Sequence, residues 1–494
     1  MNIFFILTDG ICNYERKDEK SILPIYKKLV RNKEGFYFSN VVSLFPSTIF
    51  SINSIFTGKF PYYVMPNFYS SPGGYKLKTY FDDLKKDYNI NSIICWNLGR
   101  YWLKDILNPV GDDSLYKGDK QLEAFEIYKL FKNLLNKSDL NKNNFFYVHF
   151  RAGDKNMNQY CEKIITELKR RNLWKNSIFI MTSDHGYYDK ERYKRFQPLH
   201  FDDIKQSSLS PATFIKLPNN LTNAKPRIIN KRIYLIDILE TVLDYLNIKP
   251  SIKNRQAISF KKIIEDDEDI NKDRIVRGDA YLKFQPVKKT VVIKNNWKLV
   301  YENENFKLFN LNKDEKEVID IKKKKKNIFS ELYNFYLKTE RESFKIITPI
   351  LDEFFKLSEL SKIKNQNIFI PKKQFPHELV NYLKDKLSKK NKIIENYNNY
   401  SKKDIILILF FNRLTGFGIK ELKKKYSEKS KEIKIIDLKF EELKKEQLKE
   451  IGYKNFVLSS LKKRRKVILQ RPQDILIWVF YMPIYFNKHL KKYY

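Results

Sequence analysis

The feature that most constrains the fold is a regular alternation of short apolar segments with longer amphipathic ones along the first 190 residues. The short segments predict buried strands: Asn2–Leu7, Phe36–Leu44, Ile90–Trp96, Asn144–Phe150 and Ser177–Thr182. The periodic segments predict helices: Ile22–Leu29, Leu122–Leu135 and Tyr160–Arg171. Strands that alternate with helices indicate a doubly wound α/β sheet, which binds its ligands at the carboxyl ends of the strands.

The pattern of apolar and polar residues changes further along the chain. Short alternating segments separated by Asn-rich turns, from Arg277 to Asp320, predict a small antiparallel sheet. The five lysines Lys322–Lys326 then mark a domain boundary, with an ordinary solvated stretch as the alternative. Residues 330–390 read as a charged helical region. Three further strand-like segments predict a second, smaller α/β unit: Asp404–Phe411, Lys434–Leu438 and Asn455–Ser459. The predicted domains are 1–275, 276–326, 327–400 and 401–494.

Gly416 and Gly418 follow the first strand of that smaller unit. A GxG pair without a third glycine is a weak nucleotide-binding signal and is more often an ordinary turn.

The composition excludes disorder, because 42% of the 494 residues are hydrophobic and 15% are aromatic. The three cysteines, Cys12, Cys95 and Cys161, are too few and too widely spaced for a disulfide framework or a zinc site. The apolar run at the N-terminus stops at Asp9, too early for a signal peptide. We therefore expect a cytoplasmic protein.

The charge is strongly basic, with 95 Lys and Arg against 58 Asp and Glu. Residues 327–494 alone hold 37 basic and 19 acidic residues, which indicates docking to an anionic surface or, alternatively, a codon-biased composition rich in Lys, Asn and Ile. The longest apolar run, Ile475–Phe486, is interrupted by Pro483 and is too short to cross a bilayer. Peripheral attachment to the inner membrane face is the alternative location, and no specific nucleic acid is predicted as a partner.

Three polar clusters follow predicted strands: Asp9, residues 149–154, and Asp184-His185-Gly186. A carboxylate next to an imidazole at a strand end offers two ligands for a divalent cation, and the glycine allows close approach of the backbone. An Asp-His pair in a loop can also be purely structural. The recurrence of polar clusters at strand ends favours the metal site.

A hydroxyl-rich segment begins at Phe45-Pro46-Ser47-Thr48 and ends at Thr57-Gly58. Serine or threonine at such a helix start is an N-cap in the structural interpretation. In the functional interpretation, a metal lowers the pKa of the hydroxyl and activates it as a nucleophile, and the helix N-terminus stabilises an anionic group.

Taken together, these residues resemble the sulfatase and alkaline phosphatase superfamily. The pattern consists of Asp9 after the first strand, a hydroxyl ten positions before Gly58, and Ser-Asp-His-Gly after a later strand. The resemblance continues through three downstream segments, Ser210–Pro218, Trp297–Tyr301 and Leu308–Glu317, and covers roughly residues 1–320. It implies a mixed α/β sheet followed by a small antiparallel subdomain.

The resemblance also implies roles for individual residues. Thr48 would be the covalent nucleophile and a metal ligand, with Asp9, Asp184 and His185 as the other ligands. The ten-residue spacing to Gly58 favours Thr48 over Ser47 as the nucleophile. The cofactor would be one or two divalent ions, Zn, Mn, Mg or Ca.

Three more residues lie where relatives place a second metal or groups that hold the substrate: His149, Asp154 and His200. Each has a structural alternative. His149 alternates with apolar residues and can be a core histidine, Asp154 can be a turn residue after Gly153, and His200 can lie in a surface loop.

One departure from the sulfatase pattern matters for the chemistry. Sulfatases oxidise a Cys or Ser to formylglycine within a Cys-x-Pro-Ser-Arg type motif, whereas the matching segment here is Thr48-Ile49-Phe50-Ser51-Ile52. Threonine cannot form that aldehyde, because its β-carbon bears a methyl group. A threonine nucleophile resembles the phosphodiesterase and phosphoethanolamine transferase branches, as does Gly10 where many sulfatases have a second Asp.

We therefore predict a metal-dependent hydrolase or transferase that acts on a phosphate or sulfate ester through a phosphothreonine-type intermediate. The substrate would be an anionic ester, which can be linked to a glycan or lipid. Two alternatives remain: a phosphoethanolamine-type transferase that modifies a surface glycan or lipid, and a non-catalytic anion-binding protein that retains the fold.

Overall fold

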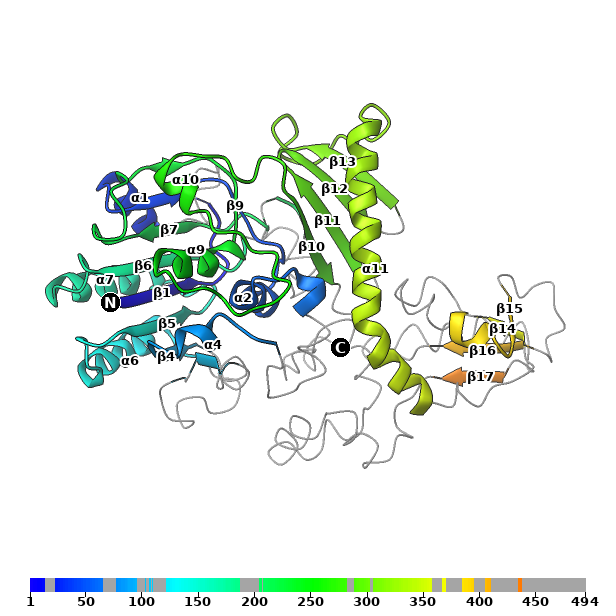
Figure 1. Ribbon diagram of the computed structural model, residues 1–494, viewed down its shortest axis with the longest axis horizontal. Coiled ribbons are helices and arrows are strands. Elements are labelled where there is room, and N and C mark those ends of the chain that lie inside the picture. Colours follow the sequence, from blue (N-terminus) through cyan, green and yellow to red (C-terminus); the bar gives the residue numbers. More distant parts are fainter. Residues whose placement is uncertain are drawn as a thin grey trace. The chain divides into compact units, whose positions relative to one another are not determined.

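The computed structural model of the chain describes residues 1–13, 23–64, 77–95, 103, 106–107, 109, 121–186, 204–206, 208–281, 288–302, 305–357, 367–369, 384–394, 405–409 and 434–437. These residues fall into two compact units (Figure 1). The first comprises residues 1–64, 74–280 and 290–336, and the second comprises residues 65–73, 281–289 and 337–494. The predicted division into four domains remains a prediction.

A seven-stranded sheet forms the centre of the first unit, in the order β4-β5-β1-β6-β7-β2-β8. Its strands are β1 (Asn2–Thr8), β2 (Phe36–Phe38), β4 (Asn89–Ile94), β5 (Asn144–Phe150), β6 (Ser177–Thr182), β7 (Thr213–Lys216) and β8 (Ile228–Ile229). All pairs are parallel except β6–β7 and β7–β2. The predicted mixed, doubly wound α/β sheet is therefore confirmed.

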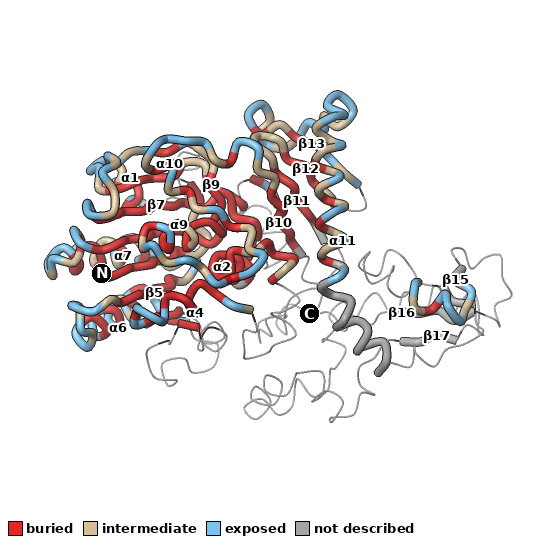
Figure 2. Tube along the Cα trace, in the orientation of Figure 1, coloured by how far each residue is buried: buried red, intermediate tan, exposed pale blue. Residues whose placement is uncertain are grey.

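Every residue of β1, β5 and β6 is buried (Figure 2). This burial on both faces explains why these strands are continuous apolar runs in the sequence. One face packs against α6 (Ala124–Lys137), where Phe131 contacts Phe4, and α6 packs in turn against α7 (Met157–Arg170), which contacts α1 (Pro24–Arg31). The other face carries α2 (Thr48–Thr57) and α4 (Phe81–Leu84), through contacts of Phe56 and Phe81 with β5.

The predicted strand Phe36–Leu44 is wrong in its extent. It is divided into β2, which belongs to the main sheet, and β3 (Val41–Val42), which pairs with β9 (Ile233–Tyr234) in a separate ribbon. The polar pair Ser39-Asn40 lies at the division, where the Asn40 carbonyl accepts a hydrogen bond from Ile233. Two more helices complete this region: α9 (Asp237–Tyr245) and α10 (Lys261–Glu265).

The predicted antiparallel sheet is also present. It consists of β10 (Ile275–Tyr281), β11 (Lys288–Lys294), β12 (Trp297–Glu302) and β13 (Asn305–Asn310), in that order. The long helix α11 (Lys326–Leu357) begins against this sheet, where Phe306 packs on Phe329, Tyr333 and Tyr336. Within the described residues, no helix is both long enough and apolar enough to span a membrane.

The second unit contains a four-stranded parallel sheet in the order β15-β14-β16-β17. Its strands are β14 (Asn367–Phe369), β15 (Lys392–Ile394), β16 (Ile405–Leu409) and β17 (Lys434–Asp437). The prediction that residues 330–390 are helical holds for α11 and for residues 384–388 and is wrong at Asn367–Phe369, which form β14 between β15 and β16. The predicted strand Asn455–Ser459, the pair Gly416 and Gly418, and the run Ile475–Phe486 lie outside the described residues.

Candidate metal centre and nucleophile

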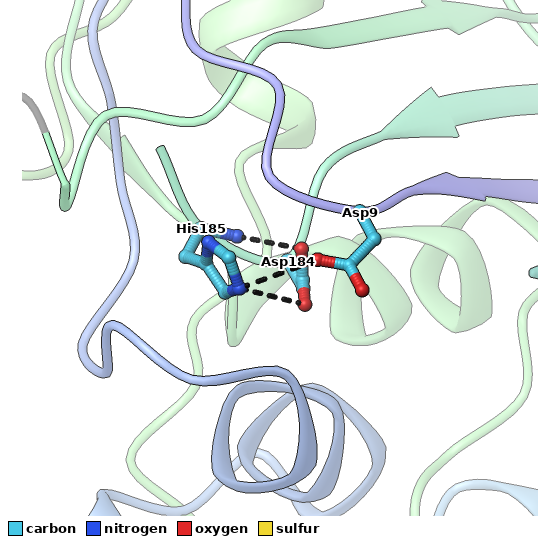
Figure 3. A group of neighbouring side chains, drawn as sticks. All are labelled: Asp9, Asp184 and His185. Carbon is cyan, nitrogen blue, oxygen red and sulfur yellow. Dashed lines mark hydrogen bonds and ion pairs between the residues drawn. The ribbon is translucent and has the colours of Figure 1, made fainter. Parts of the chain in front are cut away.

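The site lies at the carboxyl edge of the main sheet, where β1 and β6 end side by side. Leu7 of β1 is in register with Thr182 of β6. Asp9 therefore emerges next to the Asp184-His185 pair, as the parallel arrangement of the two strands requires. Figure 3 shows the side chains of these three residues converging.

Asp184 is completely buried and is oriented by the surrounding backbone. Its Oδ1 accepts hydrogen bonds from the backbone N–H groups of Gly10, at 3.2 Å, and His185, at 3.0 Å. The hydroxyls of Ser43 and Ser51 contact the Asp184 carbonyl at 2.8 and 2.5 Å. These contacts fix the carboxylate so that Oδ2 faces the other candidate ligands.

His185 is oriented through its other ring nitrogen. Nδ1 lies 3.0 Å from the carbonyl oxygen of Gly186, so Nδ1 carries the proton and donates it to that carbonyl. Nε2 is then the ring nitrogen that faces the carboxylates and is available as a metal ligand. Nε2 lies 3.3 Å from Oδ2 of Asp184 and 3.4 Å from Oδ1 of Asp9.

These separations fit a bound divalent cation. Four ligands about 2.1 Å from a tetrahedral metal lie about 3.4 Å from each other. The candidate ligand atoms of Asp9, Asp184 and His185 all lie within 4.8 Å of one another. In the part of the chain that the structure describes, Oδ2 of Asp184 is buried but accepts no hydrogen bond of normal geometry. A metal ligand role accounts for that buried oxygen.

The electrostatics of the cluster also favour a bound cation. Burial raises the pKa of Asp184, and the nearby Asp9 charge raises it further, while His185, His149 and the Thr48 hydroxyl act in the opposite direction. Two carboxylates held this close, one of them fully buried, are unfavourable unless a positive charge lies between them.

Thr48 is the first residue of α2, and Ser47 is its N-cap residue, in an extended conformation. The Thr48 hydroxyl Oγ1 lies 3.4 Å from Nε2 of His185, so it joins the same group of donor atoms. Ser47 is also buried, but its hydroxyl has no hydrogen-bond partner among the described residues and does not cap the helix. Of the two candidate nucleophiles, Thr48 is the one that contacts the cluster.

The three remaining predicted residues differ in where they lie relative to the cluster. His149 is fully buried on β5, and its Nε2 lies 3.9 Å from Oδ2 of Asp9, beside the cluster. Asp154 instead uses its two carboxylate oxygens to accept hydrogen bonds from the backbone N–H groups of Ala124, at 2.7 Å, and Asn156, at 2.8 Å. His200 lies outside the described residues.

Several residues that support the site are not predicted by the sequence pattern. Gly10 has a φ of +71°, a left-handed conformation that suits glycine, and its N–H bonds Asp184. Ser183 accepts a hydrogen bond from the Ile11 N–H and donates one to the His185 carbonyl. The hydroxyls of Ser43 and Ser51 were visible in the sequence only as part of a polar stretch, because spacing alone does not indicate which carbonyl a hydroxyl contacts.

Comparisons with known proteins agree with this geometry. Residues 153–248 match the family model described as sulfatase, a range that includes Asp184 and His185. The putative sulfatase yidJ from Bacteroides fragilis is 16% identical, with a TM-score of 0.54, over 69% of this chain and 95% of that one. The chain has a sulfatase-type fold. The predicted resemblance to the sulfatase and alkaline phosphatase superfamily is thereby confirmed, and the predicted class, a hydrolase of sulfuric or phosphoric esters, agrees with it.

Two other solved structures show the breadth of this sulfatase-type fold. Ps i-CgsB, solved in complex with k-i-k-neocarrahexaose, is 15% identical with a TM-score of 0.53, over 69% of this chain and 92% of that one. The phosphonate monoester hydrolase of Agrobacterium radiobacter is 12% identical with a TM-score of 0.52, over 69% of this chain and 96% of that one. No curated protein matches the sequence.

Proposed function

We propose that the chain is a metal-dependent hydrolase of phosphate or sulfate esters in which Thr48 is the covalent nucleophile. The observation that carries the proposal is the position of the Thr48 hydroxyl, 3.4 Å from His185 Nε2 and at the N-terminus of α2. Asp9, Asp184 and His185 would hold the divalent ion. That ion would lower the pKa of a coordinated hydroxyl and neutralise charge on the ester.

Individual residues of the chain would then have separate roles in the reaction. The Thr48 hydroxyl would lose its proton to solvent, and Oγ1 would attack phosphorus or sulfur in line with the leaving oxygen. The bond to that oxygen breaks, the leaving group departs as an alcohol after taking a proton from solvent, and an ester of Thr48 remains. The N-terminal N–H groups of α2 face the same edge and stabilise the negative oxygens of the transferred group. His149, fully buried and 3.9 Å from Asp9, can hold one of these oxygens. Water then hydrolyses the Thr48 ester.

Threonine favours phosphate over sulfate as the transferred group. The formylglycine route to sulfate hydrolysis needs an aldehyde at this position, and the Thr48 β-carbon cannot supply one. We therefore propose a phosphodiester or phosphomonoester as the first substrate class to assay. A saccharide-linked ester is a reasonable form of it, because one similar structure was solved with k-i-k-neocarrahexaose and another with D-glucosamine-2-N,6-O-disulfate.

The test measures turnover of aryl phosphodiesters, phosphomonoesters and sulfates with Mn²⁺ or Zn²⁺ added. Thr48→Ala is expected to abolish turnover while metal binding persists, and Thr48→Ser is expected to retain part of it. Ser47→Ala is the matched control, because it removes the adjacent hydroxyl and should leave activity largely intact. Acid quenching during turnover should trap a phosphate on the peptide that contains Thr48, detected by mass spectrometry.

Full activity in Thr48→Ala, or loss of activity in Ser47→Ala alone, would remove Thr48 from this role. Adding an acceptor alcohol separates the two proposed outcomes of the second step, since a transferase forms the new ester and a hydrolase releases free phosphate. A chain that binds anions but turns over none of these esters would instead be the non-catalytic binding protein.

We also propose that the protein is cytoplasmic and that its basic region after residue 326 docks on an anionic membrane surface. That region holds 37 basic and 19 acidic residues, and this excess of positive charge supports the proposal. Binding of the protein to anionic liposomes should weaken as salt is raised. Binding that does not respond to salt would favour a compositional origin of the charge.

A further inference from the structure

A buried ion pair of the antiparallel sheet holds a backbone segment that leads to the metal centre. Lys298 of β12 and Glu317, which follows β13, have side chains that are 0% and 6% exposed. The Lys298 ammonium lies 2.9 and 3.0 Å from the two carboxylate oxygens of Glu317, and it also donates a hydrogen bond to the Ile204 carbonyl. Glu317 Oε1 accepts another hydrogen bond, from the Gln206 N–H at 2.6 Å. The pair therefore fixes the backbone at positions 204 and 206.

Gln206 connects this ion pair to residues 208–212, which we call the supporting segment. The Gln206 carbonyl accepts a hydrogen bond from the Leu209 N–H at 3.2 Å, and its side-chain Nε2 donates one to Ser210 Oγ at 3.0 Å. A displacement of Gln206 would therefore displace the supporting segment with it.

The supporting segment holds the metal loop, residues 183–186, at both ends. The Ser208 carbonyl accepts a hydrogen bond from the Gly186 N–H at 2.8 Å, and the Ala212 carbonyl accepts one from the Ser183 N–H at 2.9 Å. The two candidate ligands of this loop lie between these hydrogen bonds.

The same segment holds the two other parts of the chain that enter the site. The Ser210 carbonyl accepts a hydrogen bond from the Asn13 N–H at 3.1 Å, beyond the end of β1. The Leu209 carbonyl accepts one from the Ser43 N–H at 2.8 Å, ahead of α2. The three parts of the chain that carry the candidate ligands and the nucleophile thus share one support, and the ion pair fixes the position of that support.

The backbone of Glu317 gives a second, independent indication that its side chain matters. Its φ is +56°, a left-handed conformation that glycine adopts with less strain. The Asp314 carboxylate fixes this turn by accepting hydrogen bonds from the N–H groups of Val318 and Ile319. Backbone strain of this kind persists where the surrounding structure requires it. The contacts of the carboxylate with Lys298 and Gln206 account for a glutamate at this position.

We propose that Lys298 and Glu317 are positioning residues for the metal centre. Neither is a candidate ligand, and both act through the supporting segment, which holds the metal loop in the geometry that binds a cation. Residues that orient metal ligands from outside the coordination sphere commonly change metal affinity by tenfold to a hundredfold when they are replaced. The effect on metal affinity rests on the proposed function, whereas the effect on the backbone of the metal loop does not.

The test combines calorimetric titration with Mn²⁺ and hydrogen exchange of the full-length protein in EDTA. Lys298→Met should weaken Mn²⁺ binding by about tenfold or more. It should also speed exchange in peptides that cover the metal loop, where the Gly186 and Ser183 N–H groups bond the supporting segment.

A double variant, Lys298→Met with Glu317→Gln, keeps the test decisive where the single variant does not fold. It leaves no uncompensated buried charge, and the glutamine Oε1 can still accept the hydrogen bond from the Gln206 N–H. We expect it to fold and to show both effects, since it lacks the lysine contact with the Ile204 carbonyl.

Lys216→Met is the matched control. Lys216 is also a buried lysine that donates to backbone carbonyls, those of Lys175 at 2.7 Å and Ser177 at 3.1 Å, but these lie at the start of β6, away from the metal loop. The control should lower the free energy of unfolding while Mn²⁺ affinity and exchange in the metal loop stay unchanged.

The proposal is overturned when the folded double variant binds Mn²⁺ as tightly as the wild type, when exchange in its metal loop is unchanged, or when Lys216→Met produces the same changes. A wild type that binds no Mn²⁺ would refute the metal-dependent function and the metal part of this proposal together. Faster exchange in the metal loop of the double variant alone would then still show that the ion pair orders this loop.

Discussion

Replacing Asp184 with asparagine should stabilise the metal-free protein while destroying its metal site. The ligand oxygens of Asp9 and Asp184 lie within 4.8 Å of one another, and Asp184 is completely buried. Two full charges at that separation repel by at least about 3 kcal/mol at an effective dielectric constant of 20. Burial and the nearby Asp9 charge both raise the pKa of Asp184, which shows that its charged form is disfavoured here. We therefore expect Asp184→Asn to increase the free energy of unfolding by about 1–3 kcal/mol in EDTA.

The geometry explains why the amide is tolerated. The asparagine Oδ1 can keep the hydrogen bonds that Gly10 and His185 donate to the present carboxylate. Its Nδ2 then occupies the position of Oδ2, 3.3 Å from His185 Nε2, and donates a hydrogen bond to that lone pair. One repulsive contact is thereby replaced by an attractive one.

The assay is urea unfolding in EDTA and with Mn²⁺ or Zn²⁺ at 100 times its dissociation constant. The metal should stabilise the wild type by about 2.7 kcal/mol and should leave Asp184→Asn unchanged. Asp87→Asn, at an exposed position, is the control for removing a charge. A variant less stable than the wild type in EDTA, or a wild type that metal does not stabilise, would refute the reasoning.

The same carboxyl gives the direction of a pH effect. Its native pKa lies above the unfolded value, so between these two values the native state holds more protons than the unfolded state. The free energy of unfolding of the metal-free wild type should therefore fall as pH rises through this window. Asp184→Asn should lack this component, which the difference between the two unfolding curves isolates.

Two further predictions concern ion pairs away from the site. Glu167 accepts hydrogen bonds from Arg170 and Arg171, which lower its pKa to about 2. Its contribution to the free energy of unfolding is therefore fully present at a pH above the ordinary pKa of a glutamate and is lost as the pH falls toward 2. Glu167→Gln should remove that acid-dependent component. Because Arg170 is 64% exposed, we expect the variant to lower the free energy of unfolding by only about 1 kcal/mol at pH 7, measured by urea unfolding. Arg277 and Asp279 form a fully buried pair, so Arg277→Met should cost about 3–5 kcal/mol by leaving the aspartate uncompensated, and the double variant with Asp279→Leu should recover much of this in the same assay.

Strands with one simple environment were predictable from the sequence. Asn144–Phe150 and Ser177–Thr182 match β5 and β6 residue for residue, because a strand buried on both faces must be a continuous apolar run. The apolar pattern of Phe36–Leu44 predicts one strand, because it does not reveal that the chain changes sheets at Ser39-Asn40. The three residues of β14 include only Ile368 and Phe369 as apolar residues, a run too short to distinguish a strand from a helix, and pairing with β15 and β16 decides their conformation.

The candidate site, too, was predictable from the sequence only in part. The proximity of Asp9 to Asp184 and His185 follows from the rule that parallel strands present their carboxyl ends at one edge. The sequence pattern places Asp154 with them, because a carboxylate after a glycine looks the same in sequence whether it faces a metal or accepts backbone N–H bonds. Its bonds to Ala124 and Asn156 depend on the position of α6, which a local sequence pattern does not contain.

The charge of the proposed metal centre is matched to its substrate. Position 10 is glycine, which contributes a backbone N–H to Asp184 and no third carboxylate. With Nδ1 bonded to the Gly186 carbonyl, His185 would bind the cation through Nε2 as a neutral ligand. Asp9 and Asp184 therefore bring two negative charges, which a divalent cation cancels. A neutral centre at the positive end of α2 does not repel a phosphate ester, whereas a third carboxylate at position 10 would leave a net negative charge where the anion must approach.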